Sequence, residues 1–180
     1  MTTDKDQHSS LRNKVSQGMD AVGGMAGQAS AAMVSKAPDF VEQVSISDKY
    51  EIEAAQIALQ RSSSEPVREL AQRMIDDHTH NSQELERALQ EIRPEHDLKP
   101  AGALDSRRET MIDHLRSAQD TDFDDTYINQ QVLAHQEAET LTSHYRDNGD
   151  QPRLTELAGN AHKVISSHLE HVKTMRDARR

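Results

Sequence analysis

The chain has 180 residues, of which 34% are hydrophobic, with two Phe, three Tyr, no Trp and no Cys. This length and palette favour one domain with a modest aliphatic core. The lack of cysteine excludes disulfides, zinc fingers, iron–sulfur clusters and thiolate nucleophiles, so any bound metal needs His and carboxylate ligands. The formal net charge of −10 argues against nucleic acid or an anionic membrane as partner, because both require a concentrated basic surface.

Residues 1–36 are rich in Gly, Ala, Ser and Met and differ in composition from the rest of the chain. Small residues recur every fourth position between Met19 and Met33, a pattern that lets a helix approach a partner helix closely. Because three glycines between Gly23 and Gly27 weaken an isolated helix, we predict a mobile or partner-docking tail. Through it the chain would contact another protein or a second copy of itself.

The start of the chain carries at least as many acidic as basic residues, and no apolar run reaches the ~18 residues of a membrane-spanning helix. The sequence therefore predicts no signal peptide and no transmembrane segment. We expect a soluble protein, cytoplasmic by default.

Residues 37–180 show helical periodicity and no competing strand pattern. Prolines and polar residues at the breaks predict where each helix begins, and Gly149 is expected at a helix C-cap. The predicted helices cover residues 38–62, 66–93, 104–118, 122–146 and 151–175. The expected fold class is all-α, an antiparallel bundle of four long helices plus one short helix.

Two histidines occupy positions of a buried helix stripe where aliphatic residues are expected. His78 continues the three-and-four spacing of apolar residues in 67–92, and His168 does the same in 154–175. A buried imidazole without a hydrogen bond or ligand costs ~1–3 kcal/mol, so each ring needs a partner. The centre of the bundle is therefore the expected place of function.

Four polar residues, one on each long helix, share this central level: Glu51, His78, His135 and His168. Each lies within about four residues of its helix midpoint, or roughly 6 Å along the helix axis. One polar group per helix at one level is the geometry from which bundle metal sites are built. Three imidazoles and a carboxylate predict a site for one transition-metal ion, with Zn, Cu, Mn and Fe all compatible.

Two acidic residues near these histidines have expected supporting roles. Asp77 points about 100° around its helix from His78, toward a neighbouring helix or the outer shell of the site. Glu139 lies one turn after His135 and is expected to hold that ring.

Motifs for catalysis are missing from the sequence. A di-iron oxidase needs a Glu-x-x-His pair on each of two helices, and the nearest approach here is a single Asp77-x-x-His80. There is also no glycine-rich phosphate loop, nucleophile elbow or His-Glu-x-x-His motif. We therefore predict a protein that is not an enzyme.

The run from Ala71 to His78, Ala-Gln-Arg-Met-Ile-Asp-Asp-His, resembles the bacterial domain of unknown function 4142 family. The resemblance covers about residues 38–176 and includes Phe40-Val41, Phe123-Asp124, Tyr127 and Ser167-His168-Leu169. It implies a ferritin-like helical bundle, often labelled an exported or outer-membrane protein, with no established activity. The family's characteristic Glu, Asp-His, His and His positions fall on Glu51, Asp77-His78, His135 and His168.

Two hypotheses for function remain open at this point. In the first, a ferritin-like, stress-associated bundle holds one metal ion at its central His/Glu site. In the second, the buried His/Glu layer only sets helix register, and the protein is structural or interacts with a partner through residues 1–36. An enzyme with a carboxylate-rich metal centre would require ligands that the sequence does not show.

Overall fold

The computed structural model describes residues 4–93 and 96–179, which form six helices and no strand. This confirms the predicted all-α class. In chain order the helices are α1 (Asp4–Ala31), α2 (Ala37–Arg61), α3 (Glu65–Ile92), α4 (Ser106–Ser117), α5 (Phe123–Asn148) and α6 (Pro152–Asp177). Within the described part of the chain, no helix combines the length and apolar character needed to cross a membrane.

The five predicted helices correspond to α2–α6, with every end within two residues of its predicted position. Helices α2, α3 and α6 have proline in their first two positions, where the missing N–H costs nothing. The carboxylate of Asp105 caps α4 by accepting from the backbone N–H of Arg108 at 2.7 Å. Helix boundaries in this chain therefore follow from local chemistry.

Gly149 lies at the C-cap of α5 as predicted. Its backbone conformation, however, does not require a glycine. Its φ of −67° is open to any residue. A Cβ at this position would lie 2.7 Å from Cε1 of Tyr145 and 2.8 Å from Cγ2 of Thr155. Glycine is required here because the first turn of α6 packs closely against the end of α5.

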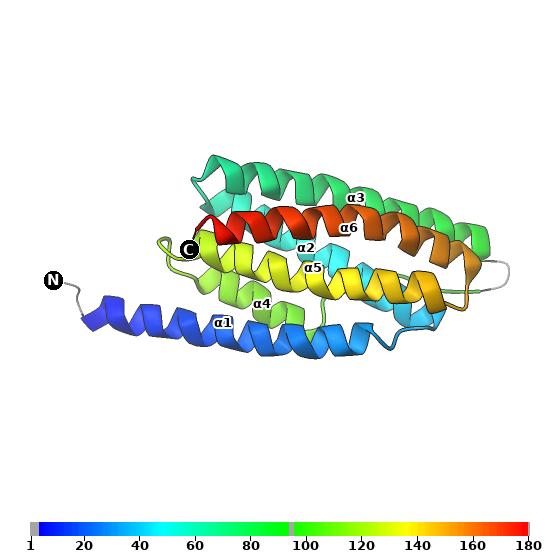
Figure 1. Ribbon diagram of the computed structural model, residues 1–180, viewed down its shortest axis with the longest axis horizontal. Coiled ribbons are helices and arrows are strands. Elements are labelled where there is room, and N and C mark those ends of the chain that lie inside the picture. Colours follow the sequence, from blue (N-terminus) through cyan, green and yellow to red (C-terminus); the bar gives the residue numbers. More distant parts are fainter. Residues whose placement is uncertain (1–3, 94–95, 180) are drawn as a thin grey trace.

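Helices α2, α3, α5 and α6 form the central bundle (Figure 1). Helix α2 runs antiparallel to α5, since the rings of Phe40 and Tyr145 stack at one end, 4.0 Å apart, and Ser62 donates to Asp124 at the other. Helices α3 and α6 also lie side by side and antiparallel. The pairs α2–α3 and α5–α6 have short connections, whereas α3 and α5 run in the same direction and are joined by a long crossover that contains α4.

The N-terminal segment differs from its predicted state. Instead of a tail, residues 4–31 form α1, which packs along α5 and α4 of the same chain (Figure 1). Asn13 donates to Asp122 at 3.2 Å, and Asp20 accepts from Gln130 at 2.8 Å, so α1 runs parallel to α5. The glycines that weaken an isolated helix serve this packing: a Cβ on Gly24 would lie 3.1 Å from the Leu133 side chain.

A buried network of charges lies where α1, α4 and α5 meet. Glu137 on α5 pairs with Arg107 at 2.6 Å and with Arg108 at 3.2 Å. The Arg108 side chain is fully buried, and its guanidinium lies 4.7 Å from the Tyr50 ring centroid. The α1 backbone at Gly27 passes directly over the Glu137 carboxylate.

The apolar core falls into two clusters toward opposite ends of the bundle. One includes Tyr50, Met74, Leu115, Tyr127 and Val172. The other includes Phe40, Leu85, Leu141, Tyr145 and Leu154. Along each central helix the two clusters are separated by buried polar residues, namely Asp48, His78, His135 and His168. The fold thus places a polar layer at mid-height of an otherwise apolar interior.

Candidate metal centre

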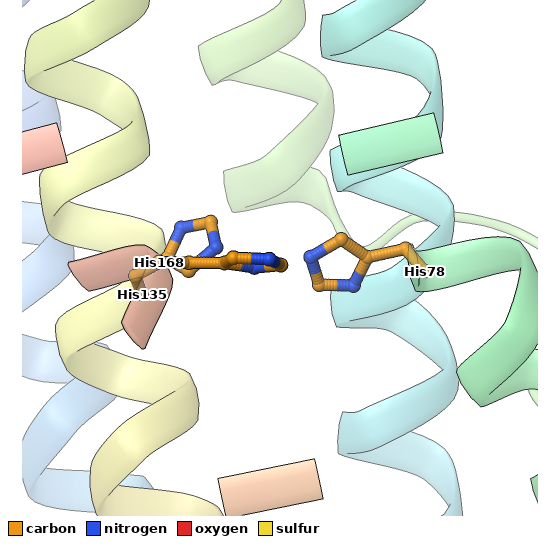
Figure 2. Close-up of side chains that lie close together, drawn as sticks. All are labelled: His78, His135 and His168. Carbon is orange, nitrogen blue, oxygen red and sulfur yellow. The ribbon is translucent and has the colours of Figure 1, made fainter. Parts of the chain in front are cut away.

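Three imidazole rings from three helices meet in this layer: His78 of α3, His135 of α5 and His168 of α6 (Figure 2). Their residues are 4%, 1% and 4% exposed. The ring centroids lie 5.4–6.0 Å apart, in edge-on or tilted orientations. One nitrogen of each ring lies within 4.8 Å of the corresponding nitrogens of the other two. We call these three residues the histidine triad.

Carboxylates hold the outer nitrogens of two triad rings. Nδ1 of His78 bonds Oδ1 of Asp48 at 2.8 Å, and Nε2 of His168 bonds Oδ2 of Asp77 at 2.9 Å. Asp48 is buried on α2 and is itself held by Asn81, which donates to its second oxygen at 2.8 Å. Because a carboxylate accepts, it keeps the proton of a neutral ring on the outer nitrogen.

The third ring, His135, is oriented by its own helix. Its Nδ1 donates to the backbone carbonyl of Gln131 at 2.9 Å. Glu51, 1% exposed on α2, places an oxygen 3.6 Å from the same nitrogen and accepts from the Gln131 side chain at 2.7 Å. Glu51 therefore lies in the polar layer, as predicted. It contacts the outer side of His135 and is not one of the three residues whose ligand atoms lie within 4.8 Å of one another. Burial raises the pKa of Glu51, against the charge of His78 and the Gln131 bond.

The inner nitrogens of the triad are buried and lack partners. Nε2 of His78, Nε2 of His135 and Nδ1 of His168 have no hydrogen bond within the described part of the chain. Each ring therefore has one nitrogen fixed by an oxygen acceptor and an opposite nitrogen that points into the layer. Metal-bound histidines have this arrangement, because the outer acceptor orients the ring and raises its basicity.

The three rings differ in their affinity for protons. Burial lowers the pKa of His135 to about 3, with the nearby His78 charge adding to the effect. Burial and the other two rings lower the pKa of His168 to about 4. Burial also disfavours a charged His78, but its bond to Asp48 and the charges of Asp48 and Glu51 outweigh that and raise its pKa. At neutral pH, His135 and His168 are uncharged and keep their lone pairs.

The structure tests the two supporting roles predicted from sequence. The expectation for Asp77 is confirmed, because it reaches across to His168 on α6. The expectation for Glu139 is wrong: its carboxylate accepts from Ser166 at 2.9 Å, while His135 uses a carbonyl of its own helix instead. Glu139 lies one turn along the same helix, but its side chain extends to α6 rather than back to the His135 ring, which turn spacing alone does not distinguish.

Sequence reasoning missed Asp48 and Gln131. A signal for Asp48 was present, because it falls on the same three-and-four stripe of α2 as Val44, Glu51 and Ala55. An aspartate at a stripe position needs a buried partner, as the histidines do. The Gln131 contribution is a backbone carbonyl, which no side-chain pattern reveals.

These features define an all-helical bundle with a buried layer of three imidazoles. The chain belongs to the family described as Domain of unknown function (DUF4142), which matches residues 23–175. The resemblance seen in the sequence is thereby confirmed, and the match extends into α1. No curated protein and no solved structure matches the chain.

Proposed function

We propose that this protein is a non-enzymatic, ferritin-like bundle whose histidine triad binds one transition-metal ion. The supporting observation is the set of three buried inner nitrogens without partners, each opposite an outer nitrogen held by an oxygen. A buried polar atom left unsatisfied costs ~1–3 kcal/mol. A single ion would satisfy all three nitrogens at once.

The charges around the triad support a divalent ion. Asp48 and Glu51 are buried carboxylates next to the rings, and the half-exposed Asp77 contacts His168. Glu51 is buried at the same level on the remaining long helix, beside the outer nitrogen of His135, so we propose that its carboxylate balances the charge of the ion from outside the three ligands. Imidazole and carboxylate suit Zn, Cu, Mn and Fe.

The ferritin-like part of the proposal is supported by chain topology. Two antiparallel helix pairs, α2–α3 and α5–α6, are joined by one long crossover. A single long crossover is the connection found in ferritin-like bundles. In this chain the crossover carries α4, and α1 adds a fifth long helix outside the four.

Elemental analysis of the purified, untagged protein tests metal binding, together with thermal melts at added Zn, Cu, Mn and Fe. We expect about one ion per chain and a raised melting midpoint, because a ligand of the native state stabilises it. His78→Ala and His168→Ala should each abolish both effects. His171→Ala, exposed on α6 one turn from His168, and His96→Ala should keep them. Equal losses in all four variants would contradict the proposal.

A second candidate function is self-association through α1, with the polar layer setting register only. Its support is the outer face of α1, where Val15, Met19, Val22 and Met25 are each more than half exposed, and Met33 just after the helix is exposed as well. The sole charged residue from position 15 to position 35 is Asp20, which is buried. Exposed apolar patches of this kind mark interaction sites.

We propose a second copy of the chain as the occupant of this face. Exposed apolar residues at positions 15, 22, 25 and 29 follow heptad spacing, which favours pairing with a like helix. Two chains of charge −10 could meet at this uncharged face without placing like charges against each other.

Sedimentation of the full chain tests self-association. A dimer is expected, and Met19→Glu with Met25→Glu should convert it to a monomer. Val164→Glu, which alters an exposed apolar residue of α6, serves as control and should leave the dimer intact. A wild-type monomer at high concentration would refute this candidate without bearing on the metal site.

A further inference from the structure

A groove of about 260 Å³ lies between α3 and α6 and is bordered by His78 and His168 of the triad. Its α3 side carries Asp77, His80 and Glu84, and its α6 side carries Leu157, Ala161 and Val164. We call this the α3–α6 groove. It connects solvent with the level of the bundle where the inner nitrogens lie.

The other sides of the triad are covered by protein. Helix α2 packs there with Glu51 and Asp48, and α5 contributes Gln131. Helices α1 and α4 in turn pack on the outside of α5 (Figure 1). An ion that approaches from solvent therefore meets the least obstruction at the α3–α6 groove.

The groove is acidic overall. Asp77 and Glu84 lie along its α3 side. Arg153 at one end of the groove is paired with Glu91 at 2.5 Å and with Glu156 at 3.5 Å. The positive charge of Arg153 is therefore offset by two carboxylates. Arg87 pairs with Glu84 alone, so Asp77 and these paired groups together leave a net negative charge at the groove. A cation is attracted to such a surface, and an anion is repelled.

Asp77 links the groove to the triad. Its side chain is 42% exposed, while one oxygen bonds Nε2 of His168 at 2.9 Å. His80, one turn further along α3, is exposed and lines the same groove. A carboxylate and an imidazole on one helix face are therefore available to a cation before it reaches the buried rings.

We propose that the α3–α6 groove is the path by which a divalent cation reaches and leaves the histidine triad, with Asp77, His80 and Glu84 as its first contacts. The inference rests on the proposed metal binding and adds the route and the sign of charge that it admits. The apolar α6 side narrows the path, so the size of the residue at Ala161 controls the rate of passage.

The test is stopped-flow uptake of Co²⁺, followed by the change in its visible absorption on binding, and release into excess EDTA. Ala161→Trp narrows the groove. Uptake and release should both slow by about tenfold or more with an unchanged Kd, because a barrier in a shared path affects both directions alike. Ala21→Trp is the control, on a half-buried alanine of α1 away from the groove, and should leave both rates unchanged.

A second variant keeps the test decisive if Ala161→Trp distorts the site. His80→Gln with Glu84→Gln alters two solvent-accessible side chains and should lower the uptake rate about threefold to tenfold at low ionic strength. The difference should shrink as salt is added. Glu86→Gln, exposed on α3 outside the groove lining, is the matched control.

The outcomes separate the two proposals. If the wild type binds no ion, the proposed function fails. If it binds one ion per chain but neither the groove variant nor the charge variant changes the uptake rate, the metal site stands and the α3–α6 groove is not its path.

Discussion

Replacing His135 with leucine should have opposite consequences with and without metal. In the metal-free protein the substitution removes one buried, unpartnered nitrogen, whose presence costs ~1–3 kcal/mol, and one hydrogen bond to Gln131 worth about 1 kcal/mol. No ion pair is lost with Glu51, because burial lowers the pKa of His135 to about 3 and the ring is neutral at pH 7. The metal-free variant should therefore be as stable as the wild type or slightly more stable.

With metal bound, the order of stability should reverse, so that the wild type is more stable than His135→Leu. An ion at 100 times its Kd stabilises the wild type by ~2.7 kcal/mol, which for a chain of this size raises the melting midpoint by roughly 5–10 °C. His135→Leu should lose this gain. Urea unfolding followed by far-UV circular dichroism, in EDTA and in saturating zinc, measures both differences, with His171→Leu as the exposed control. Equal zinc stabilisation of His135→Leu and wild type would refute the reasoning, and so would a metal-free loss above about 3 kcal/mol.

Two further predictions concern α1 and pH. Gly27→Ala should destabilise the protein by ~1–3 kcal/mol, because the new Cβ would lie 2.6 Å from Cδ of Glu137 and displace a carboxylate that is paired with two arginines. Gly18→Ala, with nothing within 4 Å, should instead stabilise α1 by up to ~1 kcal/mol, and equal effects in urea unfolding would contradict this packing. In the metal-free protein, the lowered pKa of His135 means that only the unfolded chain takes up this proton between about pH 6.5 and pH 3. The free energy of unfolding of the wild type therefore contains the full contribution of the neutral ring above pH 6.5, and this contribution falls by ~1.4 kcal/mol per pH unit below it. His135→Leu has no such loss, so its stability relative to the wild type should rise as pH falls. Parallel stability curves for the two proteins would count against a neutral buried ring.

The helices of residues 37–180 could be predicted because their signals are local. Proline in the first turn, a capping aspartate and three-and-four spacing act within one or two turns of the chain. Helix α1 was missed because the same local reasoning gives glycine a cost in an isolated helix. At Gly24 and Gly27 that cost is offset by contact with α5, which lies over 100 residues away in sequence.

The sequence predicted the height along the bundle at which the candidate site lies, but not the contacts between its side chains. His78 and His168 stood out because they interrupt apolar stripes, and His135 because it shares their height. Their separations along the helix axes follow from the rise per residue. Which atoms face each other depends on helix rotation and side-chain rotamers, so the wrong role for Glu139 and the missed partner Asp48 have the same cause.

By itself, the sequence determined the all-helical class, the helix ends, the family and the placement of polar residues at mid-height of an apolar bundle. These properties depend on backbone chemistry and on the periodicity of one helix at a time. Only the tertiary structure decided that three inner imidazole nitrogens face one another, that their outer nitrogens have oxygen partners, and that α1 covers α5 while the α3–α6 groove stays open. Those features depend on the relative rotation and spacing of helices, which is set by packing between residues distant in the chain.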